Sequence, residues 1–176
     1  MAYTIRPART RDVPVIRKLI DSNVESGHLL SKATVTLYED IQEFCVAELD
    51  GDPHGGDTAL AGCGALHVMW EDLAEIRTVA VVSPCQGLGI GHAIVRELLS
   101  RARVLGVSRV FVLTFAVDFF ARHGFQPISG TPVAAEVYSE LLRSYDEGVA
   151  EFLDLERVKP NTLGNTRMLL RLLPER

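Results

Sequence analysis

The chain has 176 residues, of which 47% are apolar and 23% are charged, and its formal net charge is −5. This length suits a single domain, 1–176, that can bury a core, and the composition is that of an ordinary globular protein. A general nucleic-acid binder carries a basic excess, so the negative charge argues against that class. No stretch approaches the ~20 apolar residues of a membrane span, and the N-terminus lacks the apolar run of a secretory signal. We therefore expect a protein that acts without a membrane or a nucleic acid.

Three cysteines, Cys45, Cys63 and Cys85, are scattered along the chain. Their number is odd and their spacing fits neither a zinc site nor a disulfide framework, so a reducing compartment, the cytoplasm, is the simpler expectation. Cys45 and Cys63 stand in apolar runs and are expected to be small core residues. No cluster of metal-ligating residues is visible either, so we expect no metal.

The first half of the chain is divided by hydrophobic periodicity and by turn residues. The loop Asp50–Asp57 separates two strands that predict an antiparallel hairpin. In the second helix we expect Leu37, Tyr38 and Ile41 to point inward. The expected elements are a strand over Tyr3–Arg6, a helix capped by Thr10 or Asp12 that ends near Asp21–Asn23, a helix after Thr34, and strands over Phe44–Leu49 and Ala59–Trp70.

The second half reads as strands that alternate with helices. A helix that leads from one strand to the next implies a crossover and a parallel pair, so the sheet is expected to be mixed. The segment Asp146–Val158 fits neither a helical nor a strand period. The expected elements are strands over Leu73–Val82, Arg109–Phe115, Phe125–Pro127 and Met168–Leu173, helices over Ala116–His123 and Val133–Tyr145, and a helix after Gly91 with an apolar stripe of Ile94, Val95, Leu98, Leu99, Ala102 and Leu105.

A glycine-spaced turn joins the β-rich run Thr78–Val82 to the helix that follows it. A strand, a glycine turn and an open helix N-terminus form an arrangement that binds phosphate through main-chain N–H groups. Glycine lets the backbone approach the anion closely, because a Cβ would hold it away. The spacing Gly87-x-Gly89-x-Gly91 is neither a Walker turn, which needs a following Lys-Ser/Thr, nor the dinucleotide fingerprint.

Two motifs carry a resemblance to a known family. Gln86, Gly89 and Gly91 match a Gln/Arg-x-x-Gly-x-Gly/Ala signature, and Asp118–Phe125 is similar to a late F-Y-x-x-x-G-F segment. Over nearly its whole length the chain resembles the GCN5-related N-acetyltransferases (GNAT). The resemblance implies an α/β (α+β) fold with a mixed central sheet, helices on both faces, and splayed parallel strands that admit the pantetheine arm of acetyl-CoA.

The resemblance also implies a set of cofactor-binding residues. Main-chain groups near Val79 and Val81 would hold the pantetheine and the thioester carbonyl, and the glycine turn would hold the pyrophosphate. The implied residues are Val79, Val81, Gln86, Gly87, Leu88, Gly89, Ile90, Gly91, His92, Phe115 and Phe120.

Glu75 is the candidate general base. In a regular strand, two-residue periodicity puts Glu75, Arg77, Val79 and Val81 on one face, where a carboxylate just ahead of the thioester donor can take a proton. The plainer alternative is a surface ion pair, for instance with Arg77. Many relatives carry a tyrosine where this chain has Phe120, which has no proton to give. Thr114 is the best substitute as general acid; unassisted departure of the thiolate, Tyr138 and Tyr145 remain open.

A narrower resemblance, to stand-alone N-acetylglutamate synthases, rests on Gly27–Lys32 followed by Leu37–Ile41, and on Ala74–Ile76, Phe119–Phe125 and Lys159–Met168. It implies acetylation of the α-amine of L-glutamate, the first step of arginine biosynthesis, with L-glutamine left open. Two carboxylates need cationic or multi-donor contacts. Many relatives have an arginine pair where this chain has Lys32. The candidate substrate-binding residues are Leu30 (through its N–H group), Lys32, Arg77, Asn165, Thr166 and Arg167.

Two other functions remain open at this point. One is an acetyltransferase for another small amine or a protein N-terminus, although the C-terminal segment 133–163 favours a covered small-molecule site. The other is a non-catalytic acyl-CoA sensor, which Phe120 favours. A homodimer through the C-terminal segment is the assembly we consider.

Overall fold

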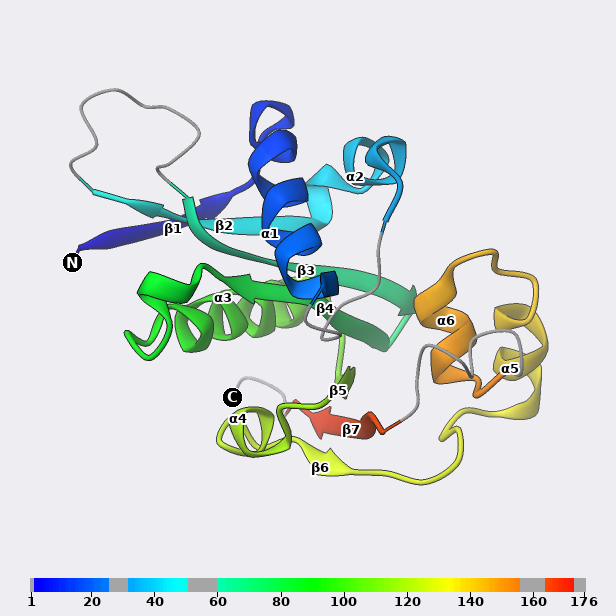
Figure 1. Ribbon diagram of the computed structural model, residues 1–176. Coiled ribbons are helices and arrows are strands. Elements are labelled where there is room, and N and C mark those ends of the chain that lie inside the picture. The colour runs from blue at the N-terminus through cyan, green and yellow to red at the C-terminus, as the bar shows by residue number, and fades with distance from the viewer. Residues whose placement is uncertain (1, 26–31, 51–59, 156–163, 173–176) are drawn as a thin grey trace. The chain divides into compact units, whose positions relative to one another are not determined.

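The computed structural model describes residues 2–25, 32–50, 60–155 and 164–172 (Figure 1). A seven-stranded sheet has the order β1-β2-β3-β4-β5-β7-β6. Its strands are β1 Tyr3–Pro7, β2 Phe44–Leu49, β3 Leu60–Trp70, β4 Leu73–Val81, β5 Arg109–Thr114, β6 Gln126–Pro127 and β7 Thr166–Arg171. The helices are α1 Val13–Glu25, α2 Thr34–Glu39, α3 Ile90–Val104, α4 Val117–Ala121, α5 Ala135–Leu141 and α6 Glu147–Phe152, with 3-10 turns η1 Thr10–Asp12, η2 Ile41–Glu43 and η3 Ser83–Cys85.

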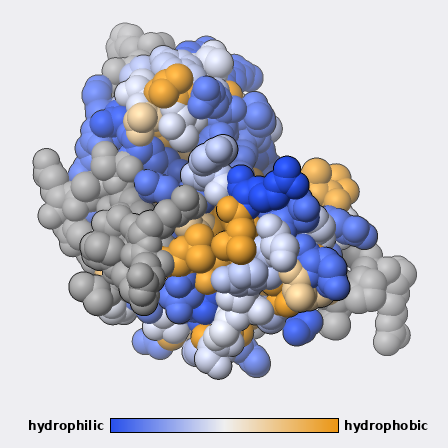
Figure 2. Space-filling model, turned by 90° about the vertical axis from the view of Figure 1, so that its right-hand side faces the viewer, coloured by the Kyte–Doolittle hydropathy of each residue, from blue (hydrophilic) through white to orange (hydrophobic). Residues whose placement is uncertain are grey.

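The chain forms two compact units. The first contains Met1–Leu66 and Ile76–Arg101, and the second contains His67–Glu75 and Ala102–Arg176. Each unit has its own buried cluster, described below. On the face in Figure 2, apolar surface is confined to patches that hydrophilic residues border.

In the first unit, β1, β2 and β3 form an antiparallel group. Tyr3 pairs with Leu49, and Phe44 pairs with Ala65, so the predicted hairpin is confirmed. Helices α1 and α2 cover one face of these strands. The cluster there contains Val13, Val15, Ile16, Leu19, Ile20, Leu37, Phe44, Val46, Leu60, Cys63, Ala65 and Ala80.

The other face of β3 packs against α3 through two glycines. A Cβ on Gly62 would lie 2.8 Å from the Ala80 carbonyl oxygen, and a Cβ on Gly64 would lie 2.6 Å from Cγ2 of Ile94. Because side chains alternate along a strand, Cys63 points to the opposite face and belongs to the α1 cluster. Helices therefore cover both faces of the sheet in this unit, as the family resemblance implied.

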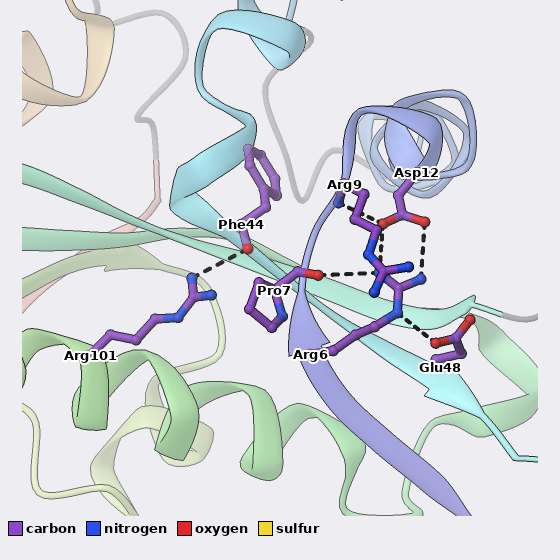
Figure 3. Close-up of polar contacts among 7 residues, drawn as sticks. All are labelled: Arg6, Pro7, Arg9, Asp12, Phe44, Glu48 and Arg101. Carbon is purple, nitrogen blue, oxygen red and sulfur yellow. Dashed lines mark hydrogen bonds and ion pairs between the residues drawn. The ribbon is translucent and has the colours of Figure 1, made fainter.

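A partly buried group of ion pairs links the start of α1 to the first two strands (Figure 3). Arg6 donates to both carboxylate oxygens of Asp12, at 2.7 and 3.1 Å, and its Nε lies 2.5 Å from Oε2 of Glu48. The N–H group of Arg9 also donates to Asp12, at 2.7 Å. Burial by itself would raise the pKa of Asp12, but the hydrogen bonds from Arg6 and Arg9 outweigh it and lower that pKa.

In the second unit, β4 and β5 are parallel over three pairs, from Leu73–Arg109 to Glu75–Phe111. β5 and β7 are antiparallel. The predicted crossover and mixed sheet are thus confirmed. Helices α5 and α6 pack on one face of these strands, in a cluster of Met69, Leu73, Phe111, Leu141, Val149, Phe152, Leu153 and Leu169.

The ambiguous segment 146–158 contains the short helix α6. Asp146 caps it, since its Oδ1 accepts a hydrogen bond from the N–H group of Val149 at 3.0 Å. The five residues from Gly148 to Phe152 are all buried. A helix buried all round has no polar face, so its sequence shows no helical period.

Two residues that we expected to point inward are exposed. Tyr38 is 46% exposed, because the six residues of α2 bury only Leu37. Leu105 is 59% exposed, because α3 ends at Val104 and Gly106 follows with a φ of +82° that stops the helix. Most of the predicted loop Asp50–Asp57 lies outside the described residues.

Candidate active site

The glycine turn between β4 and α3 has the predicted form. Gly87 and Gly89 have φ values of +78° and +82°, in the left-handed region that glycine adopts without strain. The side-chain amide of Gln86 donates to the Val81 carbonyl at 3.1 Å and so closes the turn onto the end of β4. Helix α3 already begins at Ile90, so Gly91 lies inside its first turn. First-turn N–H groups have no intrahelical acceptor, so they can bind an anion.

Thr78 interrupts the regular alternation of β4. Its φ of +60° is a left-handed conformation that costs a β-branched residue ~1–3 kcal/mol. Beyond it, Cγ2 of Val79 would lie 3.4 Å from a Cβ on Gly64, on the side of α3. Before it, the Arg77 guanidinium lies 3.2 Å from Glu43. The prediction that unbroken alternation places Glu75, Arg77, Val79 and Val81 on one face is therefore wrong.

Glu75 is a buried carboxylate. Its residue is 3% exposed, which contradicts the alternative of a surface ion pair. It stands opposite Phe111 in the last pair of the parallel ladder between β4 and β5. Burying a carboxylate is costly unless neighbouring groups compensate it, so such a residue is a candidate for chemistry.

Thr114 and Phe120 differ in what they can offer the reaction. Oγ1 of Thr114, a buried residue, accepts a hydrogen bond from the Ala116 N–H group at 2.9 Å. A hydroxyl that accepts still has a proton to donate, so Thr114 remains the candidate acid. Phe120 is buried, with ring centroids 5.0 Å from Phe119 and 5.4 Å from Phe125 in edge-to-face contacts. It is a member of an aromatic cluster.

Asn165 directly precedes β7, whose first two residues are the predicted substrate residues Thr166 and Arg167, and Thr166 pairs with Thr114. Arg167 donates to the Gly130 carbonyl at 2.8 Å and to the Phe152 carbonyl. Burial lowers the pKa of Arg167. Within the described residues, Nε of Arg167 and Oδ1 of Asn165 are buried without a hydrogen-bond partner. Each of these two atoms therefore keeps unused hydrogen-bonding capacity, Nε as a donor and Oδ1 as an acceptor.

The other predicted substrate residues belong to the first unit. The Lys32 carbonyl accepts a hydrogen bond from Arg17. Arg77 pairs with Glu43, at 3.2 Å, and with Asp40, at 3.9 Å. Leu30 lies outside the described residues.

The sequence did not predict three arginine contacts near α2, two with backbone carbonyls and one with a carboxylate. They are made by Arg17, Arg77 and Arg101. The spacing of four residues between Arg17 and Asp21, and between Glu97 and Arg101, is a signal of charged helix faces. It does not reveal the long-range acceptors of the same guanidinium groups.

A hollow of about 320 Å³ lies in the second unit beside β6 and β7, lined among others by Gln126, Ile128 and Arg171. No predicted site residue lines it. Among the described residues there is no group of three or more His, Cys, Asp and Glu that could hold a metal ion. No helix in the described ranges is both long and apolar enough to span a membrane.

Comparison with known proteins decides the family. Residues 16–125 match the family described as Acetyltransferase (GNAT) family. This chain belongs to the GNAT acetyltransferase family. The enzyme is 61% identical over 166 residues to an amino-acid acetyltransferase of Mycobacterium tuberculosis, across 94% of this chain and 92% of that protein.

Comparison with solved structures supports the same family assignment. A Mycobacterium tuberculosis protein in complex with CoA and a compound denoted NLQ superposes on this GNAT enzyme with a TM-score of 0.90 at 61% identity, over 97% of this chain and 99% of the other. N-acetylglutamate synthase from Neisseria gonorrhoeae, complexed with CoA and N-acetyl-glutamate, gives a TM-score of 0.75 at 27% identity. That match covers 98% of this chain but 36% of the longer protein. The predicted fold and family are confirmed.

Proposed function

We propose that this GNAT enzyme transfers the acetyl group of acetyl-CoA to the α-amine of L-glutamate, as the first step of arginine biosynthesis. L-glutamine is a second candidate acceptor. The observation that carries most weight is the 61% identity, over 94% of the chain, to a protein named amino-acid acetyltransferase. The N-acetyl-glutamate bound in the Neisseria gonorrhoeae relative supports glutamate as the acceptor.

The glycine turn is the proposed pyrophosphate site. The left-handed Gly87 and Gly89 free the backbone to approach an anion, and the N-terminus of α3 adds a favourable dipole. The proposed contacts run over Gln86–His92. Main-chain groups of Val79 and Val81 would bind the pantetheine, and Phe115 and Phe120 are proposed apolar contacts.

The reaction needs three events in order. Glu75 accepts a proton from the substrate ammonium, directly or through water, and the free amine attacks the thioester carbonyl carbon. Main-chain N–H groups stabilise the negative charge that develops on the carbonyl oxygen. The C–S bond then breaks, the nitrogen gives up its extra proton to form the neutral amide, and the Thr114 hydroxyl passes a proton to the departing thiolate while it regains one from water.

Glutamate as the acceptor has two carboxylates and one amine. Its binding site must supply donors for both carboxylates and must place the amine beside the thioester. The proposed contacts are the Lys32 ammonium, the N–H group of Leu30, and the three consecutive residues Asn165, Thr166 and Arg167 at the start of β7. Arg167 already gives two donors to carbonyls, so only its remaining donors can bind a carboxylate. A homodimer and a cytoplasmic location stay predictions from the sequence.

One assay tests this proposal: free-thiol release from acetyl-CoA with each of the twenty amino acids, with the product identified by mass. Preference for glutamate or glutamine supports it. If only unrelated amines are acetylated, the enzyme is still an acetyltransferase, but its acceptor is not glutamate or glutamine.

A second candidate function is a non-catalytic acyl-CoA sensor. The buried Phe120 favours it, because phenylalanine cannot protonate a thiolate. Cofactor binding without thiol release from any amine would support that candidate.

A further inference from the structure

We infer that Arg77 is a positioning residue, which acts on the acceptor substrate by holding the segment α2–η2, Thr34–Glu43, in place. The inference rests on the proposed function, because its kinetic readout is the affinity for the amino acid. It assigns Arg77 a role other than the direct carboxylate contact that the sequence predicts.

The first argument is the geometry of Arg77. Its Nη2 lies 3.2 Å from Oε2 of Glu43 and 3.9 Å from Oδ2 of Asp40. The side chains of Arg77 and Glu43 are only 9% and 18% exposed, so water screens the pair weakly. The two charges therefore attract each other more strongly than in a surface pair, and removing one partner leaves the other charge poorly solvated.

The second argument is that two other arginines hold the same segment. Arg101 of α3 donates to the carbonyls of Glu43, at 3.4 Å, and Phe44, at 3.3 Å, as Figure 3 shows for Phe44. At the other end, Arg17 of α1 donates to the Lys32 carbonyl and to Oγ1 of Thr34, at 3.2 Å. Arginines from three elements, α1, β4 and α3, thus contact the two ends of the segment α2–η2.

The third argument is that this stretch buries few apolar side chains. Helix α2 has six residues, too few to be stable alone. Leu37 is buried and Ile41 is partly buried against the same core, whereas Val35 and Tyr38 are exposed. The placement of α2–η2 therefore depends strongly on polar contacts, and so does the placement of Lys32 at its start.

The left-handed Thr78 explains how a strand residue comes to serve this purpose. Val79, directly after Thr78, packs toward α3, whereas Arg77, directly before it, reaches the end of α2. A conformation that costs a β-branched residue persists only where surrounding structure holds it. The ion pair of Arg77 with Glu43 is one such contact.

Neutralising Glu43 separates the two possible roles of Arg77, because they predict opposite signs. If Arg77 binds a substrate carboxylate, Glu43→Gln releases the guanidinium and lowers the KM for the amino acid or leaves it unchanged. If Arg77 positions α2–η2 through Glu43, Glu43→Gln loosens the segment and raises this KM, as Arg77→Gln does.

We expect each single variant to raise the KM for the amino acid about 5- to 30-fold. The KM for acetyl-CoA should change less than about twofold. The double variant should resemble either single one, because the two changes remove one interaction. Arg77→Lys keeps the charge and should restore part of the affinity. The matched control is Arg143→Gln, which breaks the exposed pair with Glu140, at 77% and 55% exposure, and should change no KM.

A second readout does not depend on activity. Amide hydrogen exchange over residues 34–44 should be faster in Glu43→Gln and Arg77→Gln than in the wild type, with the rest of the first unit unchanged. Unchanged exchange there in both variants, or an unchanged or lower KM for the amino acid in Glu43→Gln, overturns the inference. If no amino acid is acetylated at all, the proposed function fails, and the exchange measurement still decides whether Arg77 holds the segment α2–η2 in place. If Arg77→Gln does not fold, Glu43→Gln and Arg77→Lys carry both measurements.

Discussion

Replacement of Gly62 by alanine tests the contact of β3 with its neighbours. The new Cβ would lie 2.8 Å from the Ala80 carbonyl oxygen, 3.1 Å from Cδ1 of Ile94 and 3.2 Å from Cγ2 of Val81. The nearest atom is backbone of β4, which cannot move without shifting the strand. Overpacking of this kind typically costs ~1–3 kcal/mol, and the intrinsic preference for alanine over glycine returns ~0.5–1 kcal/mol.

We therefore expect Gly62→Ala to lower the free energy of unfolding by about 1–2 kcal/mol. In urea, with a slope of roughly 2 kcal/mol/M, the midpoint should fall by roughly 0.5–1 M at an unchanged slope. Far-ultraviolet circular dichroism measures this directly. Because Ala80 adjoins the proposed pantetheine contacts at Val79 and Val81, the KM for acetyl-CoA should also rise.

Gly64→Ala is the matched comparison. Its Cβ would lie 2.6 Å from Cγ2 of Ile94 and 3.1 Å from Cδ1 of Leu98, which are side-chain atoms. A clash with side chains can be relieved by a second substitution, so Gly64→Ala combined with Ile94→Ala should cost less than the sum of the two single changes. The same relief should be small for Gly62, where the obstacle is backbone. If Gly62→Ala proves as stable as the wild type, the close packing of β3 on β4 and α3 is wrong.

Three further predictions concern the site and the N-terminal ion pair. Glu75→Gln should lower kcat by ~10²–10⁴-fold while cofactor affinity stays unchanged; normal turnover at saturation with weakened cofactor binding would contradict the assigned base. Gly89→Val should weaken acetyl-CoA binding by calorimetry at least tenfold, because a β-branched residue resists the φ of +82°; unchanged affinity would mean that the pyrophosphate binds elsewhere. The pKa values of Asp12 and Glu48 are lowered in the folded state, so the unfolded state binds more protons in acid and stability must fall as the pH drops below the ordinary carboxylate range of about 4. Urea midpoints at pH 7, 5, 4 and 3 should show this loss, with a smaller one in Asp12→Asn; equal losses in both proteins would remove the ion pair as its cause.

Features that depend on residues close together in the chain could be predicted from the sequence alone. The glycine turn followed from the spacing of Gly87, Gly89 and Gly91 between a β-rich run and a helical stripe, because residues without a Cβ let the backbone approach an anion closely. The hairpin followed from two alternating runs around a loop. These features depend on neighbours in the chain, so the sequence alone was sufficient for them, and the family could be recognised from the same residues.

Other features were decided only when distant segments met. Thr78, a β-branched residue, looks like an ordinary strand position, and only the packed sheet holds it at a φ of +60°. The guanidinium of Arg77 pairs with Glu43 and Asp40, and that of Arg167 donates to two backbone carbonyls. The spacing of residues in the sequence indicates none of these contacts. Helix α6 escaped detection because burial on all sides erased its period. In each case the deciding energy comes from burial and charge pairing between residues far apart in the chain, which local patterns do not record.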